Sequence, residues 1–190
     1  MVDKKFQQYI NGLSFLTGAV RYHDLCYVLA LDDEAVEQNA EHAIVMELDR
    51  GQWGAELKPV SYTTTAPSFH PKEKNIFLST KGKIYQMGQG IFEDSQIPQA
   101  PDDTRPFFFK EINCIANGKA YAVGPCRICY RRDDTEVWTR IDHGAQTDDM
   151  DLMDSGFSSI DGFSDDDIYT AGWGGELWHY DSTCCTRFLK

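Results

Sequence analysis

Two runs of aspartates are the residues in this chain whose type and spacing most directly suggest chemistry. The first run comprises Asp148, Asp149, Asp151 and Asp154, and the second comprises Asp165, Asp166 and Asp167. A calcium loop needs oxygen ligands at alternating positions with a glycine and a distal glutamate, and only part of that pattern is present. The same carboxylates could attract lysines and arginines of a partner protein, or form solvated turns. We predict partner binding by these residues and by Trp173 in the hairpin that follows.

The motif Cys126-Arg127-Ile128-Cys129 has the spacing of a zinc knuckle or a redox dithiol. Neither a second C-x-x-C motif nor a finger-like histidine pair accompanies it. Its place in the repeat described below puts Cys126 in a hairpin turn and Cys129 in the core. Because a free cysteine often acts as a small buried hydrophobic residue, we predict a structural role for both thiols. The prediction therefore includes no metal and no cofactor.

The histidines do not define a catalytic centre. They are scattered through the sequence at His23, His42, His70, His143 and His179. A catalytic nucleophile needs a base within hydrogen-bonding reach and a third group that orients the base. No spacing in the chain indicates such a set, so we predict no catalytic residues.

The charge balance is strongly acidic. Asp and Glu number 30 against 18 Lys and Arg, which gives a formal net charge of −12. Such a surface repels phosphate backbones, so nucleic-acid binding is not expected. It would attract a basic protein and speed the encounter with it, although acidity also keeps proteins soluble. We predict a basic protein partner.

The N-terminus and the cysteines favour the cytoplasm. The opening Met-Val-Asp-Lys-Lys-Phe-Gln-Gln has no apolar run typical of a signal peptide, and no later segment is long and apolar enough to span a bilayer. The six cysteines show no extracellular framework spacing, which is typical of a reducing compartment. We expect a cytoplasmic protein without a membrane partner.

These residues belong to a sequence that repeats. Aromatic anchors within short apolar segments recur at intervals of 50, 44 and 48 residues, at Tyr27, Phe77, Tyr121 and Tyr169. Repeats of roughly 40 to 50 residues with several strands each indicate a propeller-like array. We predict an all-β, single domain over residues 1–190, with antiparallel blades at approximately 20–66, 67–106, 107–154 and 155–190.

The last two repeats align without gaps over their first residues. Ile112–Gly124 and Ile160–Gly172 each run from a strand through a polar turn into an alternating strand that ends at glycine. The pair Gly174-Gly175 then supplies the positive φ that a tight hairpin needs. Outside the repeats, Phe6, Tyr9, Ile10 and Leu13 lie on one helical face. A short N-terminal helix and an extended closing strand are both open for that segment.

The fourth repeat resembles the blade consensus of WD40/YVTN/BNR-like bacterial β-propellers. The resemblance rests on Phe157–Gly162, Asp166–Gly172 and Gly175–Asp181, and it weakens toward the first two repeats. The hairpins Glu47–Trp53 and Asp133–Trp138 are similar to the Asp box of BNR repeats and sialidases, without the arginine cluster and tyrosine nucleophile of sialidases. The resemblance implies four-stranded blades used as a binding platform, as in some immunity proteins of bacterial toxin systems.

Three architectures remain open: a closed four-blade ring, part of a larger propeller, or an open array completed by a second chain as a homo-oligomer. The leading functional hypothesis is a non-enzymatic protein whose acidic loops engage a basic partner, most concretely a toxin-neutralising immunity protein. The alternatives are a propeller-class glycan hydrolase or lyase that works through carboxylates, and a structural module of a larger assembly.

Overall fold

The computed structural model describes residues 10–99, 101, 107–146 and 155–189. Within them, the strands form four antiparallel sheets of four strands each, and every sheet follows the order of the sequence. The first sheet contains β1 (Leu13–Tyr22), β2 (Leu25–Asp32), β3 (Ala43–Asp49) and β4 (Gln52–Lys58), and the second contains β5 (Tyr62–Ser68), β6 (Lys74–Ser79), β7 (Lys83–Gly88) and β8 (Ile91–Gln96). The third contains β9 (Glu111–Cys114), β10 (Ala120–Gly124), β11 (Ile128–Arg132) and β12 (Trp138–Arg140), and the fourth contains β13 (Phe157–Ser164), β14 (Asp167–Gly172), β15 (Leu177–Tyr180) and β16 (Cys185–Leu189).

Helix is scarce, as predicted. Among the described elements, the only α-helix is the short α2 (Asp33–Glu37), and Trp173–Gly175 forms a single 3₁₀ turn. Helix α2 lies in the connection between β2 and β3, residues 33–42, which we call the insertion. Asp32 caps the helix by accepting a hydrogen bond from the Ala35 amide. No helix in the described ranges is long and apolar enough to cross a membrane.

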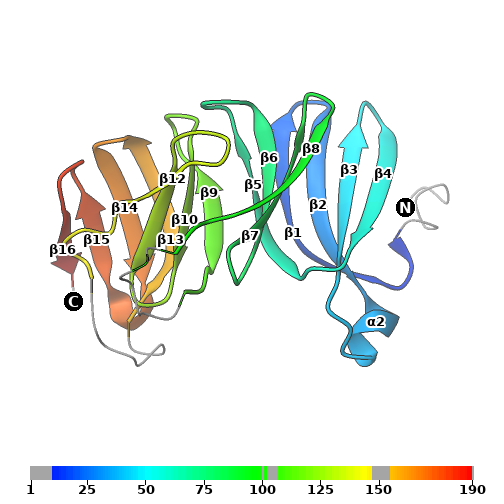
Figure 1. Ribbon diagram of the computed structural model, residues 1–190, viewed down its shortest axis with the longest axis horizontal. Helices are drawn as coiled ribbons and strands as arrows, with labels where there is room; N and C mark the ends of the chain where they lie inside the picture. Colours follow the sequence, from blue (N-terminus) through cyan, green and yellow to red (C-terminus); the bar gives the residue numbers. More distant parts are fainter. Residues whose placement is uncertain (1–9, 100, 102–106, 147–154, 190) are drawn as a thin grey trace.

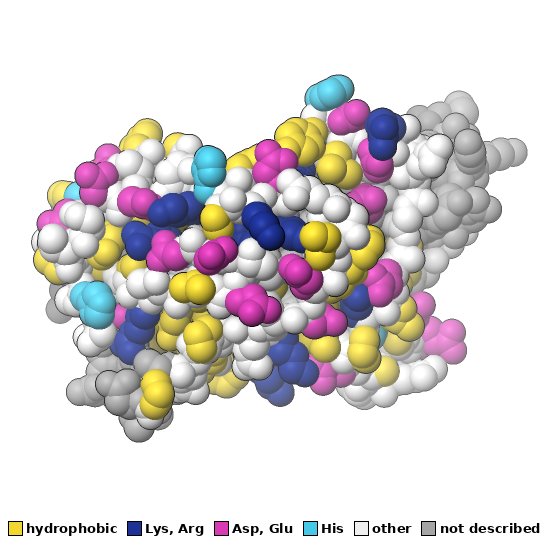
Figure 2. Space-filling view, turned by 45° about the horizontal axis from the view of Figure 1, so that its top comes forward, with side chains coloured by type: hydrophobic (Ala, Val, Ile, Leu, Met, Phe, Trp, Pro, Cys, Tyr) yellow, Lys and Arg dark blue, Asp and Glu magenta, His cyan; other side chains and the backbone are white. Residues whose placement is uncertain are grey.

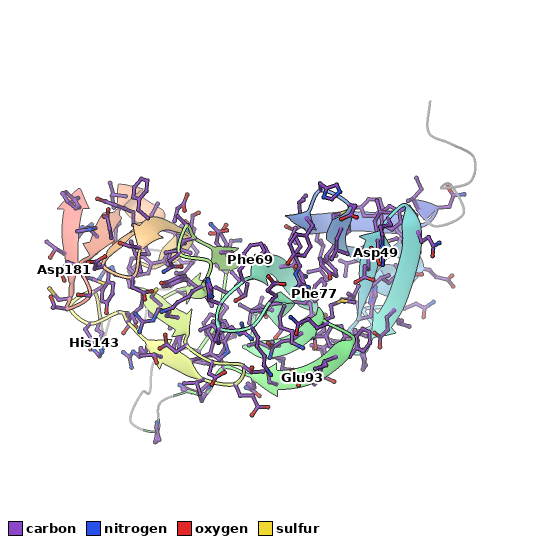
Figure 3. The ribbon with its side chains drawn as sticks, turned by 90° about the horizontal axis from the view of Figure 1, so that it is seen from above. Asp49, Phe69, Phe77, Glu93, His143 and Asp181 are labelled. Carbon is purple, nitrogen blue, oxygen red and sulfur yellow. The ribbon has the colours of Figure 1, made fainter. Side chains whose placement is uncertain are left out.

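The four sheets form an open arc. The first strands of neighbouring sheets pack beside one another, β1 with β5, β5 with β9, and β9 with β13. Figure 1 shows the first and fourth sheets at opposite ends of the molecule, and the view from above in Figure 3 shows the curvature between them. The prediction of four antiparallel blades is confirmed, and the described sheets do not close into a ring.

A separate hydrophobic core fills each space between neighbouring sheets. Phe77 and Tyr85 pack on Tyr27 and Leu29 between the first and second sheets. Ile84, Phe109, Ala122 and Tyr130 are among the residues between the second and third sheets, and Tyr121, Phe157, Ile168 and Trp178 are among those between the third and fourth. Each sheet therefore depends on its neighbour to bury an apolar face.

The sequence repeat corresponds to one strand position. The anchors Tyr27, Phe77, Tyr121 and Tyr169 all lie in the second strand of their sheets, namely β2, β6, β10 and β14. The first three are buried, with exposed fractions of at most 1%. Tyr169 is only half-buried because it lies on the outward face of the fourth sheet, where it packs with His179 and Phe188.

Two details differ from the sequence-based expectation. The boundary placed between residues 66 and 67 falls inside β5, so the first and second sheets meet between Lys58 and Tyr62, and β1 begins before residue 20, at Leu13. Ile10, the first described residue, is helical and Leu13 is a strand residue, whereas Phe6 and Tyr9 lie outside the described residues. Hydrogen bonding to β2 determines the conformation of Leu13, which pairs with Asp32.

The glycines that end the aligned strands allow close approach of two chain segments. A Cβ on Gly124 would lie 2.0 Å from the carbonyl oxygen of Phe108, and one on Gly172 would lie 2.1 Å from that of Gly156. Any side chain at either position would push a backbone segment away. The glycines shared by the third and fourth repeats are therefore packing requirements.

Candidate partner-binding surface

The turns between the first and second strands of all four sheets lie at one end of the molecule. The Tyr22 hydroxyl donates to Glu73 at 2.6 Å, the Phe69 amide donates to the Gly118 carbonyl at 2.7 Å, and the Asn117 side chain donates to Asp165 at 2.8 Å. These contacts join the first turn of each sheet to that of the next. The turns between third and fourth strands lie at the same end, because an antiparallel chain reverses at every turn.

We call this end the turn face, and several carboxylates lie on it. They are Asp24, Asp49, Glu73, Asp133, Asp134, Glu136, Asp165, Asp166 and Asp181. The cations on the same turns are Arg50, Lys72 and Lys119. Figure 2, with the turn face brought forward, shows acidic and basic side chains interspersed over its surface.

Asp165 holds the third and fourth sheets together. It accepts hydrogen bonds from Lys119 at 2.5 Å, the Tyr121 hydroxyl at 2.7 Å and Asn117 at 2.8 Å. Burial by itself would raise the pKa of Asp165, but the hydrogen bonds from Lys119 and Tyr121 and the charges of Lys119 and Arg131 outweigh it and keep the pKa below its usual value. This carboxylate is ionised at neutral pH, and its charge is already compensated within the chain.

The other two aspartates of the second run have different surroundings. Asp166 is exposed and accepts a hydrogen bond from Ser164, so its carboxylate faces solvent in the turn between β13 and β14. Asp167 is the first residue of β14 and contacts the His179 ring, with 3.0 Å between Oδ1 and Nε2. Asp166 is therefore the residue of this run best placed to meet a partner.

Trp173 lies at the opposite end of the fourth sheet from Asp165 and Asp166. It begins the 3₁₀ turn between β14 and β15, its amide donates to the Gly156 carbonyl, and its ring lies against Gly156. The structure therefore does not bring Trp173 together with the turn between β13 and β14 that contains Asp165 and Asp166. The residues Asp148, Asp149, Asp151 and Asp154 lie outside the described part of the chain.

Exposed carboxylates that sequence reasoning missed complete the turn face. Asp134 and Glu136 lie between β11 and β12, and Asp181 lies between β15 and β16. Asp181 accepts hydrogen bonds from the Thr183 hydroxyl and the Cys184 and Thr183 amides, which lower its pKa to about 2. The Asp-box-like hairpins, which contain Asp49, Asp134 and Glu136, were the signal that could have identified these turns.

Cys126 and Cys129 occupy the positions predicted for them. Cys126 lies in the turn between β10 and β11, and Cys129 lies in the core between the third and fourth sheets. Burial raises the pKa of the Cys129 thiol well above its usual value, which makes it a poor nucleophile and metal ligand. Among the described residues, no group of three or more His, Cys, Asp or Glu side chains could hold a metal ion.

Comparison of the structure with solved structures defines the class of fold. The chain is similar to YCF48 from Cyanidioschyzon merolae, with a TM-score of 0.54 and 12% identity over 96% of this chain and 73% of that one. It is also similar to a luciferin-regenerating enzyme, with a TM-score of 0.54 and 10% identity over 88% of this chain and 56% of that one. Both likenesses are to β-propeller-like structures, and at these identities they show the fold alone.

Comparison of sequences gives a more specific likeness. The chain is 37% identical over 174 residues to the protein named Immune protein Tsi7 from Pseudomonas aeruginosa. The match covers 88% of this chain and 56% of the relative, so the chain spans little more than half the length of that protein. No family model matches the chain.

Proposed function

We propose that this chain is a non-enzymatic immunity protein that neutralises a bacterial toxin by binding it. The observation that carries the proposal is the 37% identity to an immune protein over 88% of the chain. The relative's name describes an immune protein rather than an enzyme, in agreement with the prediction that no catalysis occurs here. The luciferin-regenerating enzyme is too distant in sequence to transfer an activity.

The toxin would meet the turn face through the carboxylates that form no ion pair with another described residue. Asp134, Glu136 and Asp166 are exposed on adjacent sheets, and the chain has an excess of acidic residues. Complementary charge steers two proteins together and fixes their orientation. A basic toxin surface is therefore the partner that this face favours.

The proposed location is the cytoplasm, where an immunity protein would protect the cell that makes the toxin. All six cysteines are free thiols, Cys26, Cys114, Cys126, Cys129, Cys184 and Cys185. Free thiols persist in a reducing compartment. Fractionation of the native cells with an antibody against the chain would test this placement.

The first test is rescue of growth. The product of the gene adjacent to the one that encodes this chain is expressed in a bacterial host, alone and together with the chain. We expect arrest with the neighbour alone, growth with both, and a complex that co-purifies. Arrest that the chain does not relieve, with no complex formed, would overturn the proposal.

The triple variant Asp134→Lys, Glu136→Lys and Asp166→Lys tests the binding surface. We expect affinity for the toxin to fall by about tenfold or more, mainly through slower association, because attractive rim charges become repulsive. Binding kinetics at two salt concentrations provide the measurement, and the wild-type association rate should fall as salt rises. An unchanged rate in the variant would show that the toxin binds elsewhere.

The open arc also bears on the predicted self-association. Phe15 and Val20 are 51% and 70% exposed on the outward face of the first sheet. Exposed apolar faces of repeat units tend to associate, so we propose that a second copy covers this face at high concentration. Light scattering over a range of concentrations tests the proposal, and a mass that stays monomeric throughout contradicts it.

A further inference from the structure

Three adjoining hollows lie at the end of the molecule opposite the turn face, and helix α2 lines two of them. Their volumes are about 570, 500 and 360 Å³. The first and second share Leu57, Lys58 and Pro59, and the second and third share Ala40, Glu41 and His42. We call these three hollows together the α2 groove, which extends from β8 past the end of β4 to α2. Figure 1 shows α2 below the first sheet.

Carboxylates form most of the charged rim of the α2 groove. Asp32, Glu34, Glu41, Glu56 and Asp94 line it, against the cations Lys58 and Lys83. Glu34, Glu41 and Asp94 are exposed. They stand on both sides of the groove, because Glu34 and Glu41 belong to the insertion and Asp94 belongs to β8.

The lysine at the middle of the groove adds little repulsion toward a cation. Lys58 Nζ lies 2.6 Å from Glu56 Oε1 and 3.5 Å from the centre of the Tyr85 ring, and its side chain is only 13% exposed. Its charge is thus held against a carboxylate and an aromatic face. Lys83 is exposed, but the exposed carboxylates Glu34, Glu41 and Asp94 outnumber it, so the field that an incoming side chain meets is mainly negative.

Apolar side chains border the same groove. Leu57 is 67% exposed and Val36 is 46% exposed. Leu31, Pro59 and Val60 also contribute to the lining. Large aliphatic side chains left in water beside a hollow are typical of a surface that binds another molecule.

His42 holds the insertion in a fixed shape. Its ring is buried, the Asp32 amide donates to Nε2 at 2.9 Å, and Nδ1 lies 2.8 Å from the Ala40 carbonyl. Since an amide must donate, Nε2 accepts and Nδ1 carries the proton that bonds Ala40. A groove with its wall fixed in advance loses less conformational entropy on binding.

We propose that the α2 groove binds a peptide segment of the toxin in which an aliphatic side chain is flanked by lysine or arginine. The aliphatic group contacts Leu57 and Pro59, which line the same two hollows, and the cations meet Glu41 on one side and Asp94 on the other. This proposal rests on the proposed function, because it assigns a second contact with the same partner. Its chemistry differs from that of the turn face, since it requires an apolar group as well as positive charge.

Peptide probes test the proposal without the toxin. The full chain is titrated with a fluorescent short peptide of alternating lysine and leucine, and with matched lysine–serine and glutamate–leucine peptides. We expect the lysine–leucine peptide to bind at least tenfold more tightly than either of the others. Equal binding of the lysine–serine peptide would show that only charge is sensed, and would overturn the proposal.

Two double variants locate the binding. Glu41→Lys with Asp94→Lys alters the groove, and Glu136→Lys with Asp166→Lys alters the turn face; each changes the net charge equally, from −12 to −8. We expect the groove variant to weaken the lysine–leucine peptide by about tenfold and the turn-face variant to weaken it less than twofold. All four residues are exposed, so melting temperatures should stay close to that of the wild type.

The same groove variant is then compared in the growth test. Rescue that equals wild type, with unchanged toxin affinity, would overturn the groove proposal while leaving the proposed function intact. Peptide binding in the groove without rescue by the wild-type chain would instead overturn the proposed function alone. We expect weakened toxin binding by the groove variant together with normal rescue by the wild-type chain.

Discussion

The substitution Glu176→Ala is expected to lower the free energy of unfolding by about 3–5 kcal/mol. Glu176 is 4% exposed and accepts hydrogen bonds from Arg127 at 2.6 and 2.7 Å and from the Trp178 indole at 2.7 Å. Arg127 belongs to the third sheet's hairpin and Glu176 to the fourth sheet's. The alanine variant leaves the guanidinium in a largely buried position without this carboxylate. Urea unfolding followed by tryptophan fluorescence provides the measurement.

Two variants serve as controls for Glu176. Replacing both members, as in Arg127→Leu with Glu176→Leu, should cost less than the single change, because the largely buried guanidinium is removed together with its carboxylate and only the more exposed Arg187 loses an ion-pair partner. Glu136→Ala, at an exposed position, should stay within about 0.5 kcal/mol of wild type. A Glu176→Ala protein as stable as wild type would show that the ion pair does not hold the two sheets together.

Glu176 also gives the stability a dependence on pH. Burial by itself would raise its pKa, but the hydrogen bonds from Arg127 and Trp178 and the charges of Arg127 and Arg187 lower the pKa below its usual value. The unfolded chain then binds more protons than the folded chain below about pH 4.3. Stability should be full above that pH and fall as acid is added through the lower folded-state pKa, with a weaker dependence in Glu176→Ala.

The substitution Phe77→Ala is expected to cost about 3–5 kcal/mol. Phe77 is fully buried between the first and second sheets, where its ring packs on Tyr27 and Tyr85 with centroids 6.0 Å away in each case. Neighbouring strands hold the walls of that space, so an alanine leaves a cavity that can collapse only in part. Chemical unfolding of both proteins in the same buffer gives the difference.

Tyr169→Ala is the matched control, since Tyr169 occupies the equivalent position in the fourth sheet. Its ring is half-buried and packs with His179 and Phe188 on an outward face. We expect a loss of about 1 kcal/mol. Equal losses from the two substitutions would mean that burial between sheets is not what the anchor position provides.

The repeat could be predicted because the first three sheets bury an aromatic residue at the same strand position. The second strand is central in its sheet and packs against a neighbouring sheet, so apolar and aromatic residues recur there, as at Tyr27, Phe77 and Tyr121. The first strands are harder to recognise: β5 reads Tyr-Thr-Thr-Thr-Ala-Pro-Ser, with Thr65 bonded to the Ile76 carbonyl and to Asn75. Three consecutive threonines leave this strand with few apolar residues, although Tyr62 and Ala66 are buried. The apolar pattern of the sequence is therefore weak there, and the predicted boundary falls inside the strand.

The acidic character of the surface could be predicted, but the roles of individual carboxylates could not. Asp165 is engaged by Lys119, and Glu176 by Arg127, each from a neighbouring sheet and more than 40 residues away in the sequence. Such pairing depends on how the sheets pack. The separation of Trp173 from Asp166 could have been predicted from the order of the strands. Successive turns of an antiparallel sheet lie at alternating ends, and these two residues lie in successive turns.

The open arc predicts that the outer sheets unfold locally more often than the inner ones. Among the described residues, the second and third sheets are packed on both faces, whereas the first and fourth are each packed on one. Amide hydrogen exchange should accordingly be slowest in β6 and β10 and progressively faster toward β2 and β14. A toxin that bridges several sheets would slow exchange at the outer sheets most, so the map of slowed amides would also mark where it binds.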